Sequence, residues 1–387
     1  MSRNPDHEIR IFEFDRPGLP FIPFGITYDA ASLRYTEKFY EPGTFEIVIP
    51  LGAHYAREFK KYRYVIIGRR FHGIILGVQY EAQADGDMLT VTGQSLLGLL
   101  TQRITVPPNV MGNTIMAGFD SIQADSETVI KHFITNNVTA PLSTPRSIPG
   151  FFIAENQQRG TQNDKYASRY DVLSDVIGMV GHDAKLGLVC RLDIEGGRIV
   201  FDVVQSKDRT HGQNQNPRVI FSINRGTVLG MTHSDNDAGM RNSFYTTMAG
   251  SEFEDEALTM MYYRPEDEAD PPSGVYRREM HMEISADHPT PGMEYDELKR
   301  LALINMTNYE GLLSFVSDVN FAHIQYGRDY DLGDIVTVQN LDWGVTMDIE
   351  LIGMTVEHTG RGGNYTAVFG SQKPNLIKAV KKAIQMG

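Results

Sequence analysis

Apolar and polar residues alternate along the first hundred residues in a way that predicts β-strands. Ile9 to Phe14 alternates with a period of two, as expected for a strand with one buried face. Phe39 to Ile49 predicts a hairpin, in which Pro42-Gly43 suits a type II turn. Two further strands are predicted at 62–67 and 72–80. Short strands at this spacing favour a small barrel over a parallel sheet.

A short apolar helix, Ser95 to Leu100, is predicted to close one end of this barrel before Pro107-Pro108. The pattern then changes. Residues 126–134 place their apolar side chains on one helical face. A second helix is predicted from Tyr170 to Val180, with Ser168 as its cap and Gly181 as its end. Two strands follow, at 186–192 and 199–204, which together with the helices indicate an α/β insertion.

Strand patterns return after the insertion, at 218–223, 228–233 and 242–248. The polar and acidic stretch 251–292 predicts a solvated loop. A helix is expected at 295–309, a second β module at 315–372, and a C-terminal helix at 375–386 behind Pro374.

The predicted class is therefore mainly β with α/β insertions, an α+β chain with two similar small antiparallel barrels, inserted domains and a C-terminal helix. At 387 residues the chain is long enough for two to four domains. The expected boundaries are 1–108 for the first barrel, 109–216 for the α/β insertion, 217–250 with 315–372 for the second barrel, 251–314 for the acidic loop and helix insertion, and 373–387 for the terminal helix.

One hairpin pattern occurs at both ends of the chain. Leu76-Gly77-Val78-Gln79-Tyr80-Glu81 is followed, after a turn, by Leu89 to Ser95, and Ile352-Gly353-Met354-Thr355-Val356-Glu357 is followed by Tyr365 to Gln372. The repeated positions are Gly77 with Gly93 and Gly353 with Gly370, and the two spacings differ by one turn residue. This pattern indicates a duplicated scaffold. The alternative is that any two antiparallel hairpins with glycine turns look this similar.

The net charge of −13 argues against a nucleic-acid groove or an anionic membrane surface as a partner. Neither a signal peptide nor a membrane span is expected, since the N-terminus has no apolar core and the apolar run 64–78 contains charges. The single cysteine, Cys190, excludes an internal disulfide and lies in a predicted buried strand.

We find no motif that predicts catalysis, a cofactor or a metal site. Gly93 to Gly98 misses the spacing of a nucleophile elbow, and no HExxH, Walker loop or CxxC occurs. Asp235 to Gly239 suggests a calcium loop, but a polar turn is favoured because the frame lacks its final glutamate. His182-Asp183 is favoured as a helix-terminal cap over a catalytic dyad. Trp343 is favoured as a turn anchor over a sugar platform.

The segment from Leu89 through Gly93-Gln94-Ser95 to Pro108 resembles the first-barrel exit of the siphophage tail-hub family. Three further blocks agree with it in the same order, Ala167 to Leu173, Arg218 to Ser222 and Asp329 to Val338. Members of this family are tail-tip baseplate proteins, also called tail-associated proteins, of phages that mostly infect Gram-positive bacteria.

The resemblance implies a homotrimer in which each chain contributes two barrels to a pseudo-sixfold ring. The implied partners are the distal tail protein, the tail tube and tape-measure proteins, and tip or receptor-binding proteins, with DNA only in transit. The implied location is the virion tail tip, assembled in the host bacterial cytoplasm, without membrane insertion. Some relatives carry C-terminal peptidoglycan-cleaving or receptor-binding domains, which are not expected in a chain that stops at Gly387.

Three roles remain open on the sequence: a structural hub, a receptor- or carbohydrate-binding tail protein, and a tail-associated cell-wall hydrolase. The hub is preferred and the chain is expected not to be an enzyme. An acidic lumen would keep passing DNA from adhering. A possible docking loop, which would order on contact with a neighbour, contains Glu252, Glu254, Asp255, Glu256, Glu266, Asp267, Glu268 and Asp270.

Overall fold

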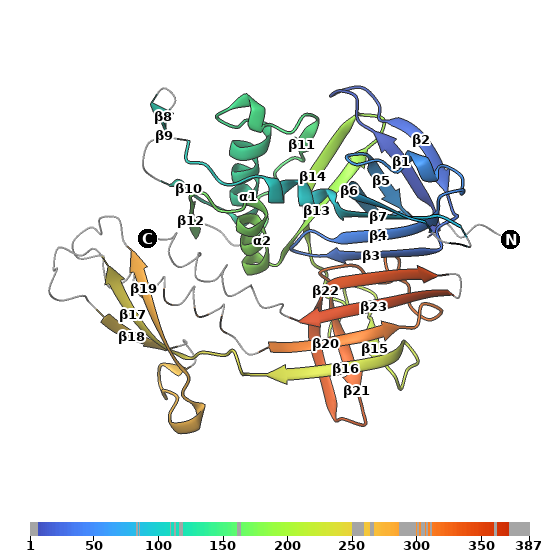
Figure 1. Cartoon of the computed structure of the whole chain (residues 1–387). Coiled ribbons are helices and arrows are strands. Elements are labelled where there is room, and N and C mark those ends of the chain that lie inside the picture. Colours follow the sequence, from blue (N-terminus) through green and yellow to red (C-terminus); the bar gives the residue numbers. More distant parts are fainter. Residues whose placement is uncertain are drawn as a thin grey trace. The chain divides into compact units, whose positions relative to one another are not determined.

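Strands dominate the computed structural model, which confirms the predicted mainly-β class with an α/β insertion (Figure 1). The structure describes residues 7–370 except 83, 85, 109, 112–113, 116–118, 161–163, 250–258, 264–266, 286–298, 360–361 and, between 299 and 311, all but 299, 302, 306 and 309. Two compact units divide the chain. The first comprises Met1–Thr232 with Val316–Phe369, and the second His233–Phe315 with Gly370–Gly387.

The described strands include one 13-stranded sheet. Its N-terminal strands are β1 (Ile9–Glu13), β2 (Ile22–Thr27), β3 (Ser32–Lys38), β4 (Thr44–Pro50), β5 (Tyr64–Ile67), β6 (Phe71–Glu81) and β7 (Met88–Ser95). Its C-terminal strands are β15 (Ile220–Ser222), β16 (Val228–Asn236), β20 (Leu312–Val319), β21 (Ile335–Asn340), β22 (Val345–Thr359) and β23 (Gly362–Gly370). Alternation explains their burial, as in β4, where Phe45, Ile47 and Ile49 are buried between more exposed neighbours.

The region between these two sets of strands contains the α-helices α1 (Ser126–Ile134) and α2 (Leu173–Ala184). A parallel pair of β11 (Phe151–Ile153) and β14 (Arg198–Gln205) is extended by antiparallel β13 (Leu186–Asp193). Smaller elements are β8 (Val110–Met111), β9 (Thr114–Ile115), β10 (Asp120–Ala124), β12 (Asp164–Ser168), and the short helices η2 (Ala56–Glu58), η3 (Leu96–Gln102), η4 (Thr135–Thr139) and η5 (Thr144–Arg146).

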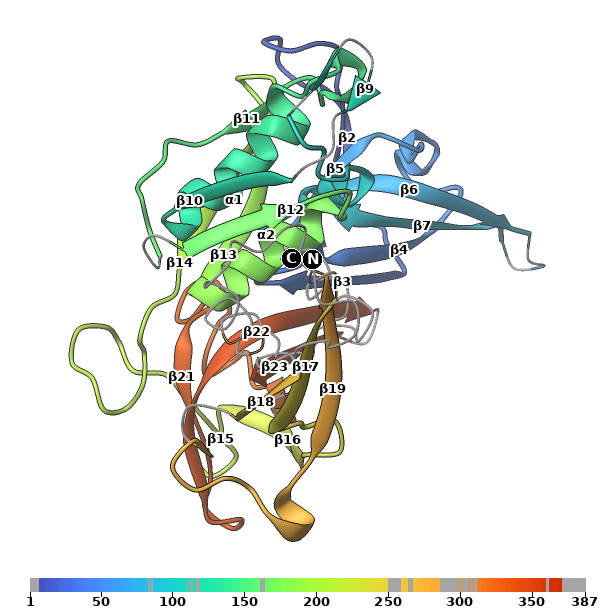
Figure 2. The ribbon, with the colours of Figure 1, turned by 90° about the vertical axis from the view of Figure 1, so that its left-hand side faces the viewer.

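One apolar core joins this inserted region to the N-terminal strands. It includes Phe12 of β1, Leu96 and Leu100 of η3, Phe133 of α1 and Ile177 of α2. The predicted apolar helix after β7 is thus present as the 3₁₀ helix η3, and it lies between the sheet and the two α-helices. Figure 2 shows both α-helices beside β13 and β14.

The second unit contains a separate three-stranded sheet in the order β18 (Thr259–Tyr263), β17 (Ser243–Ala249), β19 (Glu279–Ser285). β17 pairs antiparallel with β18 and parallel with β19. A 3₁₀ turn, η7 (Gly274–Tyr276), precedes β19. The prediction of one solvated loop across 251–292 is therefore wrong at β18 and β19, whose apolar residues Tyr262 and Met282 are buried.

Two boundaries differ from the predicted ones for packing reasons. The predicted hairpin over Phe39 to Ile49 is instead formed by β3 and β4, and residues 39–41 belong to the connection between these strands. Gly43 does not take the left-handed conformation of a type II turn; a Cβ there would lie 1.9 Å from the Thr36 carbonyl oxygen. The second helix begins at Leu173 without a Ser168 cap and continues through Gly181 to Ala184. Gly181 lies inside the helix at a place where the chain packs closely on it, since the Leu186 carbonyl oxygen would be 2.6 Å from a Cβ there.

The predicted helix at 295–309 lies almost entirely outside the described residues, and the predicted helix at 375–386 lies entirely outside them. By contrast, the helix at 126–134 is confirmed with the predicted bounds. Asp125 caps it by accepting a hydrogen bond from the Thr128 amide at 3.0 Å.

Candidate functional site

Three consecutive strands recur in the two halves of the large sheet, β5–β6–β7 and β21–β22–β23. In each triplet the middle strand has an irregularity directly before a glycine. The register shifts between Ile75 and Gly77 in β6, and between Leu351 and Gly353 in β22. Both hairpins thus share their strand order and the place of one extra residue, which bends a strand locally.

The sequence pattern equates Gly93 with Gly370 in the second strands of the two hairpins. The pairing of the strands gives a correspondence that is shifted by one residue. Gly93 lies opposite Ile75, whereas Phe369 lies opposite Leu351. By register, Gly93 therefore corresponds to Phe369, and Gly370 is the next residue, at the end of β23 with a φ of 99°. The two glycines also differ in surroundings, because Phe45 packs over Gly93 while Phe369 carries its own buried ring.

The recurrence extends beyond the hairpins to six strands. The sheet order is β3-β4-β7-β6-β5-β1 in the N-terminal half and β16-β20-β23-β22-β21-β15 in the C-terminal half. When β2 is left out and the six strands of each half are numbered along the chain, both orders are second, third, sixth, fifth, fourth, first. One difference is strand direction, since β1 runs antiparallel to β5 while β15 runs parallel to β21.

The two halves meet where β3 pairs with the second part of β22, which we call the central pairing (Figure 1). Its register runs from Gly353 opposite Lys38 to Thr359 opposite Ser32. The hydroxyls of Thr36 and Thr355 are hydrogen-bonded at 3.0 Å. At the surface, Arg34 Nε lies 2.9 Å from Glu357 Oε1. β3 was not predicted from the sequence, although the alternation of apolar Leu33 and Tyr35 with polar neighbours is typical of a strand.

A charged cluster beside the central pairing links the same two halves. Arg70, between β5 and β6, donates to the carboxylate of Asp331 and lies 4.4 Å from the ring centre of Tyr326. Burial raises the pKa of the Glu37 carboxyl on β3, and the Arg70 cation only partly opposes this. Burial also raises the pKa of the Tyr326 hydroxyl. The Arg70–Asp331 pair therefore links two segments that are far apart in the sequence.

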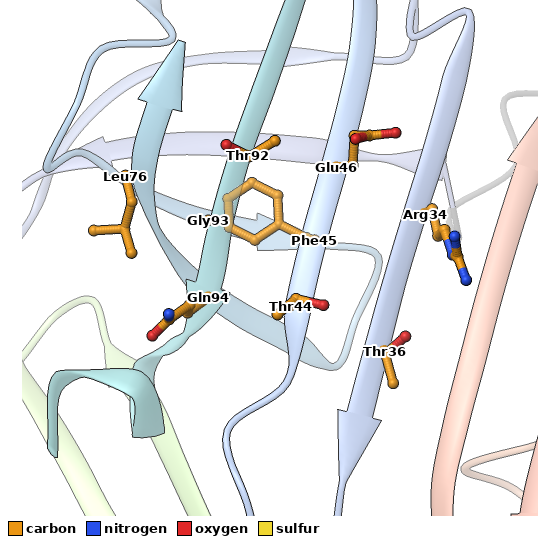
Figure 3. A pocket seen from close by; sticks show the side chains of 9 residues that line it. All are labelled: Arg34, Thr36, Thr44, Phe45, Glu46, Leu76, Thr92, Gly93 and Gln94. Carbon is orange, nitrogen blue, oxygen red and sulfur yellow. The ribbon is translucent and has the colours of Figure 1, made fainter. Parts of the chain in front are cut away.

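A groove of about 500 Å³ crosses β3, β4 and β7 on the face near the central pairing (Figure 3). Its walls are Arg34, Thr36, Thr44, Phe45, Glu46, Leu76, Thr92, Gly93 and Gln94. The bulged residue Leu76 and the repeat position Gly93 thus face one surface feature. Threonine hydroxyls and one charge of each sign suit hydrogen bonding to a peptide or another polar surface. The lining contains no histidine, cysteine or serine.

The acidic residues predicted as a docking loop are only partly described. Glu252, Glu254, Asp255, Glu256 and Glu266 lie outside the described residues. Asp267 is partly exposed, and Glu268 and Asp270 are exposed. Glu268 lies 3.0 Å from Lys299 Nζ.

Other side chains singled out in the sequence lie outside the central pairing and the groove. His182 Nδ1 is 3.8 Å from Asp183 Oδ1 in the last turn of α2, and both side chains are partly exposed. Trp343 is 49% exposed in the turn between β21 and β22, where its amide donates to Asn340 Oδ1. Cys190 is buried in β13, and burial raises the pKa of its thiol.

Among the described side chains, no three His, Cys, Asp or Glu residues are grouped so that they could hold a metal ion. The helices in the described ranges are all too short or too polar to cross a membrane.

The sequence matches the model of the family described as Siphovirus ReqiPepy6 Gp37-like protein over residues 24–371. No curated protein matches it.

Solved phage tail proteins share the fold along almost their full length. The 43 kDa tail protein of prophage MuSo2 from Shewanella oneidensis aligns with a TM-score of 0.58 at 10% identity, covering 94% of this chain and 98% of that one. A tail protein from Neisseria meningitidis gives a TM-score of 0.52 at 13% identity, and the prophage tail protein gp18 from Listeria monocytogenes gives 0.50 at 11%. Each of the latter two alignments covers 97% of this chain and 98% of the other.

Proposed function

Because the chain belongs to the Siphovirus ReqiPepy6 Gp37-like family and has the fold of phage tail proteins, we propose that it is a structural hub of a siphophage tail tip. The observation that carries the proposal is the six-strand order that occurs twice in one sheet. A chain with two equivalent halves can contribute two of six similar positions, so three chains complete a ring with approximate sixfold symmetry. Such a ring matches a sixfold tail tube on one side and a threefold tip on the other.

The proposed partners follow from this position. They are two further copies of the chain, the distal tail protein, the tube and tape-measure proteins, and tip or receptor-binding proteins. Asp267, Glu268 and Asp270, with the neighbouring acidic residues, form a negative segment that suits a basic surface on one of these neighbours.

DNA would pass through the ring without being retained. The net charge of −13 per chain supports this, since like charge repels the phosphate backbone. We propose no catalytic role. The hub function needs only rigid interfaces, and Glu37 and Tyr326, whose pKa values burial raises, lie beside the Arg70–Asp331 pair that links the two halves.

The native mass of the protein tests the hub proposal. A chain of 43.4 kDa that forms a closed trimer should elute as a particle of about 130 kDa, alone or after mixing with the tail component encoded beside it. Mass photometry or light scattering gives this value directly. A protein that stays at the single-chain mass in both conditions contradicts the proposal.

The exposed side chain of Trp343 favours a second candidate function, that of a carbohydrate-binding or receptor-binding tail protein. An indole that is 49% exposed at the tip of a strand turn can stack on a sugar ring. Binding to a glycan array that Trp343→Ala abolishes would support this function. Absence of glycan binding by the assembled particle would remove it. Zymography on host cell walls separates both roles from a hydrolase.

A further inference from the structure

The duplicated halves of the sheet also differ in what lies beside the middle strand of each triplet. In the C-terminal half, the segment after the bulge of β22 (Gly353–Thr359) pairs with β3. In the N-terminal half, β6 pairs with β5 only from Phe71 to Ile74, before its bulge. Within the part of the chain that the structure describes, no strand lies along the outer edge of β6 from Gly77 to Glu81.

The strand that would correspond to β3 is β16, and it also has an open edge. With β2 left out, β3 and β16 are each the second strand of their half, and each lies next to the third strand in the sheet order. β3 has β22 on its other side, whereas β16 is the last strand on its side of the sheet among the described elements. Each molecule therefore has two strand edges without a pairing strand among the described elements, Gly77–Glu81 of β6 and the outer edge of β16.

These two edges lack two of the residues that commonly protect an edge strand, and each carries a single charge, Asp235 on β16 and Glu81 on β6. Neither β16 nor residues 77–81 contain lysine or proline. The opposite end of the sheet differs. There β2 contains Pro23, and its pairing with β1 is irregular between Ile11 and Phe12. The contrast indicates that β16 and β6 are kept open for a partner, while β2 is protected.

From this we infer that β16 of one copy pairs antiparallel with Gly77–Glu81 of β6 in the next copy, repeating the central pairing between chains. This inference rests on the proposed function, because the repeated link must close into the ring of three chains. Each copy then uses one edge of each kind, as a head-to-tail ring requires.

The central pairing also predicts the register between copies. His233 on β16 stacks on Phe315 of β20 at 4.3 Å, and Tyr35 on β3 lies opposite Phe45 of β4. His233 thus takes the place of Tyr35, and Ser234 the place of Thr36. Gln79 lies two residues after the bulge glycine Gly77, as Thr355 does after Gly353. We therefore expect Gln79 of one copy to lie opposite Ser234 of the next copy, as Thr355 lies opposite Thr36 within the chain.

Cysteine cross-linking between separately made variants tests this register. Gln79→Cys and Ser234→Cys proteins are mixed, allowed to assemble and oxidised, and the products are separated on a non-reducing gel. We expect disulfide-linked dimers from the mixture and none from either variant alone. Tyr80→Cys in place of Gln79→Cys should give at least tenfold less product, because successive residues of a strand face opposite sides.

A matched control uses the pairing inside the chain. Thr36→Cys with Thr355→Cys should form a disulfide without any increase in mass, since these hydroxyls are 3.0 Å apart. The native Cys190 is present in every variant, and because it is buried we do not expect it to form cross-links between copies.

Native mass measured on the same samples separates the two proposals. A trimer in which the Gln79→Cys and Ser234→Cys variants form no disulfide with each other overturns this pairing and leaves the hub function standing. Failure to assemble under any condition overturns the hub function and, with it, this inference.

Discussion

At the scale of single residues, the two repeated glycines Gly93 and Gly353 have different roles. A Cβ on Gly93 would lie 2.1 Å from the Ile74 carbonyl oxygen and 2.4 Å from the Phe45 ring, whereas the nearest atom to a Cβ on Gly353 is at 3.6 Å. Gly93→Ala should lower the free energy of unfolding by about 1–3 kcal/mol through overpacking. Gly353→Ala should leave it unchanged or raise it by about 0.5 kcal/mol. Equal effects in denaturant titrations would contradict this distinction.

A second residue-scale prediction concerns Glu127, a fully buried carboxylate at the start of α1. It accepts hydrogen bonds from Lys131 Nζ at 2.6 Å and from Arg159 Nε at 2.8 Å. Removing one member of a buried ionic network leaves uncompensated charge, so Glu127→Gln should cost about 3 kcal/mol. Glu357→Gln, which alters the exposed pair with Arg34, should cost under about 0.5 kcal/mol.

The pH dependence of stability provides a further readout for Glu127. Burial raises the pKa of this carboxyl, but the hydrogen bonds from Arg159 and Lys131 outweigh burial and lower it from 4.5 to about 2. The contribution of Glu127 is therefore complete above pH 4.5 and is lost as the pH falls from 4.5 towards 2. Thermal melts from neutral pH down to about pH 2 should show the difference between wild type and Glu127→Gln shrinking across that window. A constant difference would assign the effect to packing.

At the scale of elements, η3 is the contact between the sheet and the inserted helices. Leu100 is fully buried in the core that η3 shares with α1 and α2. Leu100→Ala should lower the free energy of unfolding by about 2–5 kcal/mol, because it leaves a cavity at that junction. Leu142→Ala, at a residue 47% exposed, is the matched control and should have little effect. A small loss for Leu100→Ala would show that the insertion folds independently of the sheet.

Elements with local signals could be predicted from the sequence. α1 combines an apolar face with a capping Asp125, and both act within a few residues, so its bounds agree with the pattern. The end of α2 was predicted too early, because Gly181 was interpreted as a helix stop, whereas it lies inside the helix where Tyr40, distant in sequence, packs against it. The central pairing joins residues more than 300 positions apart, such as Thr36 and Thr355, and no local pattern encodes such a partner. The hairpin repeat was visible, but its match in the second strand shifted by one residue once the bulges were known.

At the scale of the whole molecule, charge predicts behaviour towards DNA. A chain of net charge −13 should bind neither duplex nor single-stranded DNA at physiological salt, because no excess of cations is available to replace counterions. Fluorescence anisotropy with a labelled oligonucleotide checks this, with a basic protein of similar size as the control. Binding that weakens steeply with added salt would contradict the proposed free passage of DNA.

The length of β22 has a mechanical consequence. Its 15 residues extend continuously from the pairing with β21 to the pairing with β3. A pull along this strand loads the seven residue pairs of the central pairing together, in shear, and a pull across it would open them one after another. The link between the two halves would therefore resist a force along β22 more strongly than a force across it.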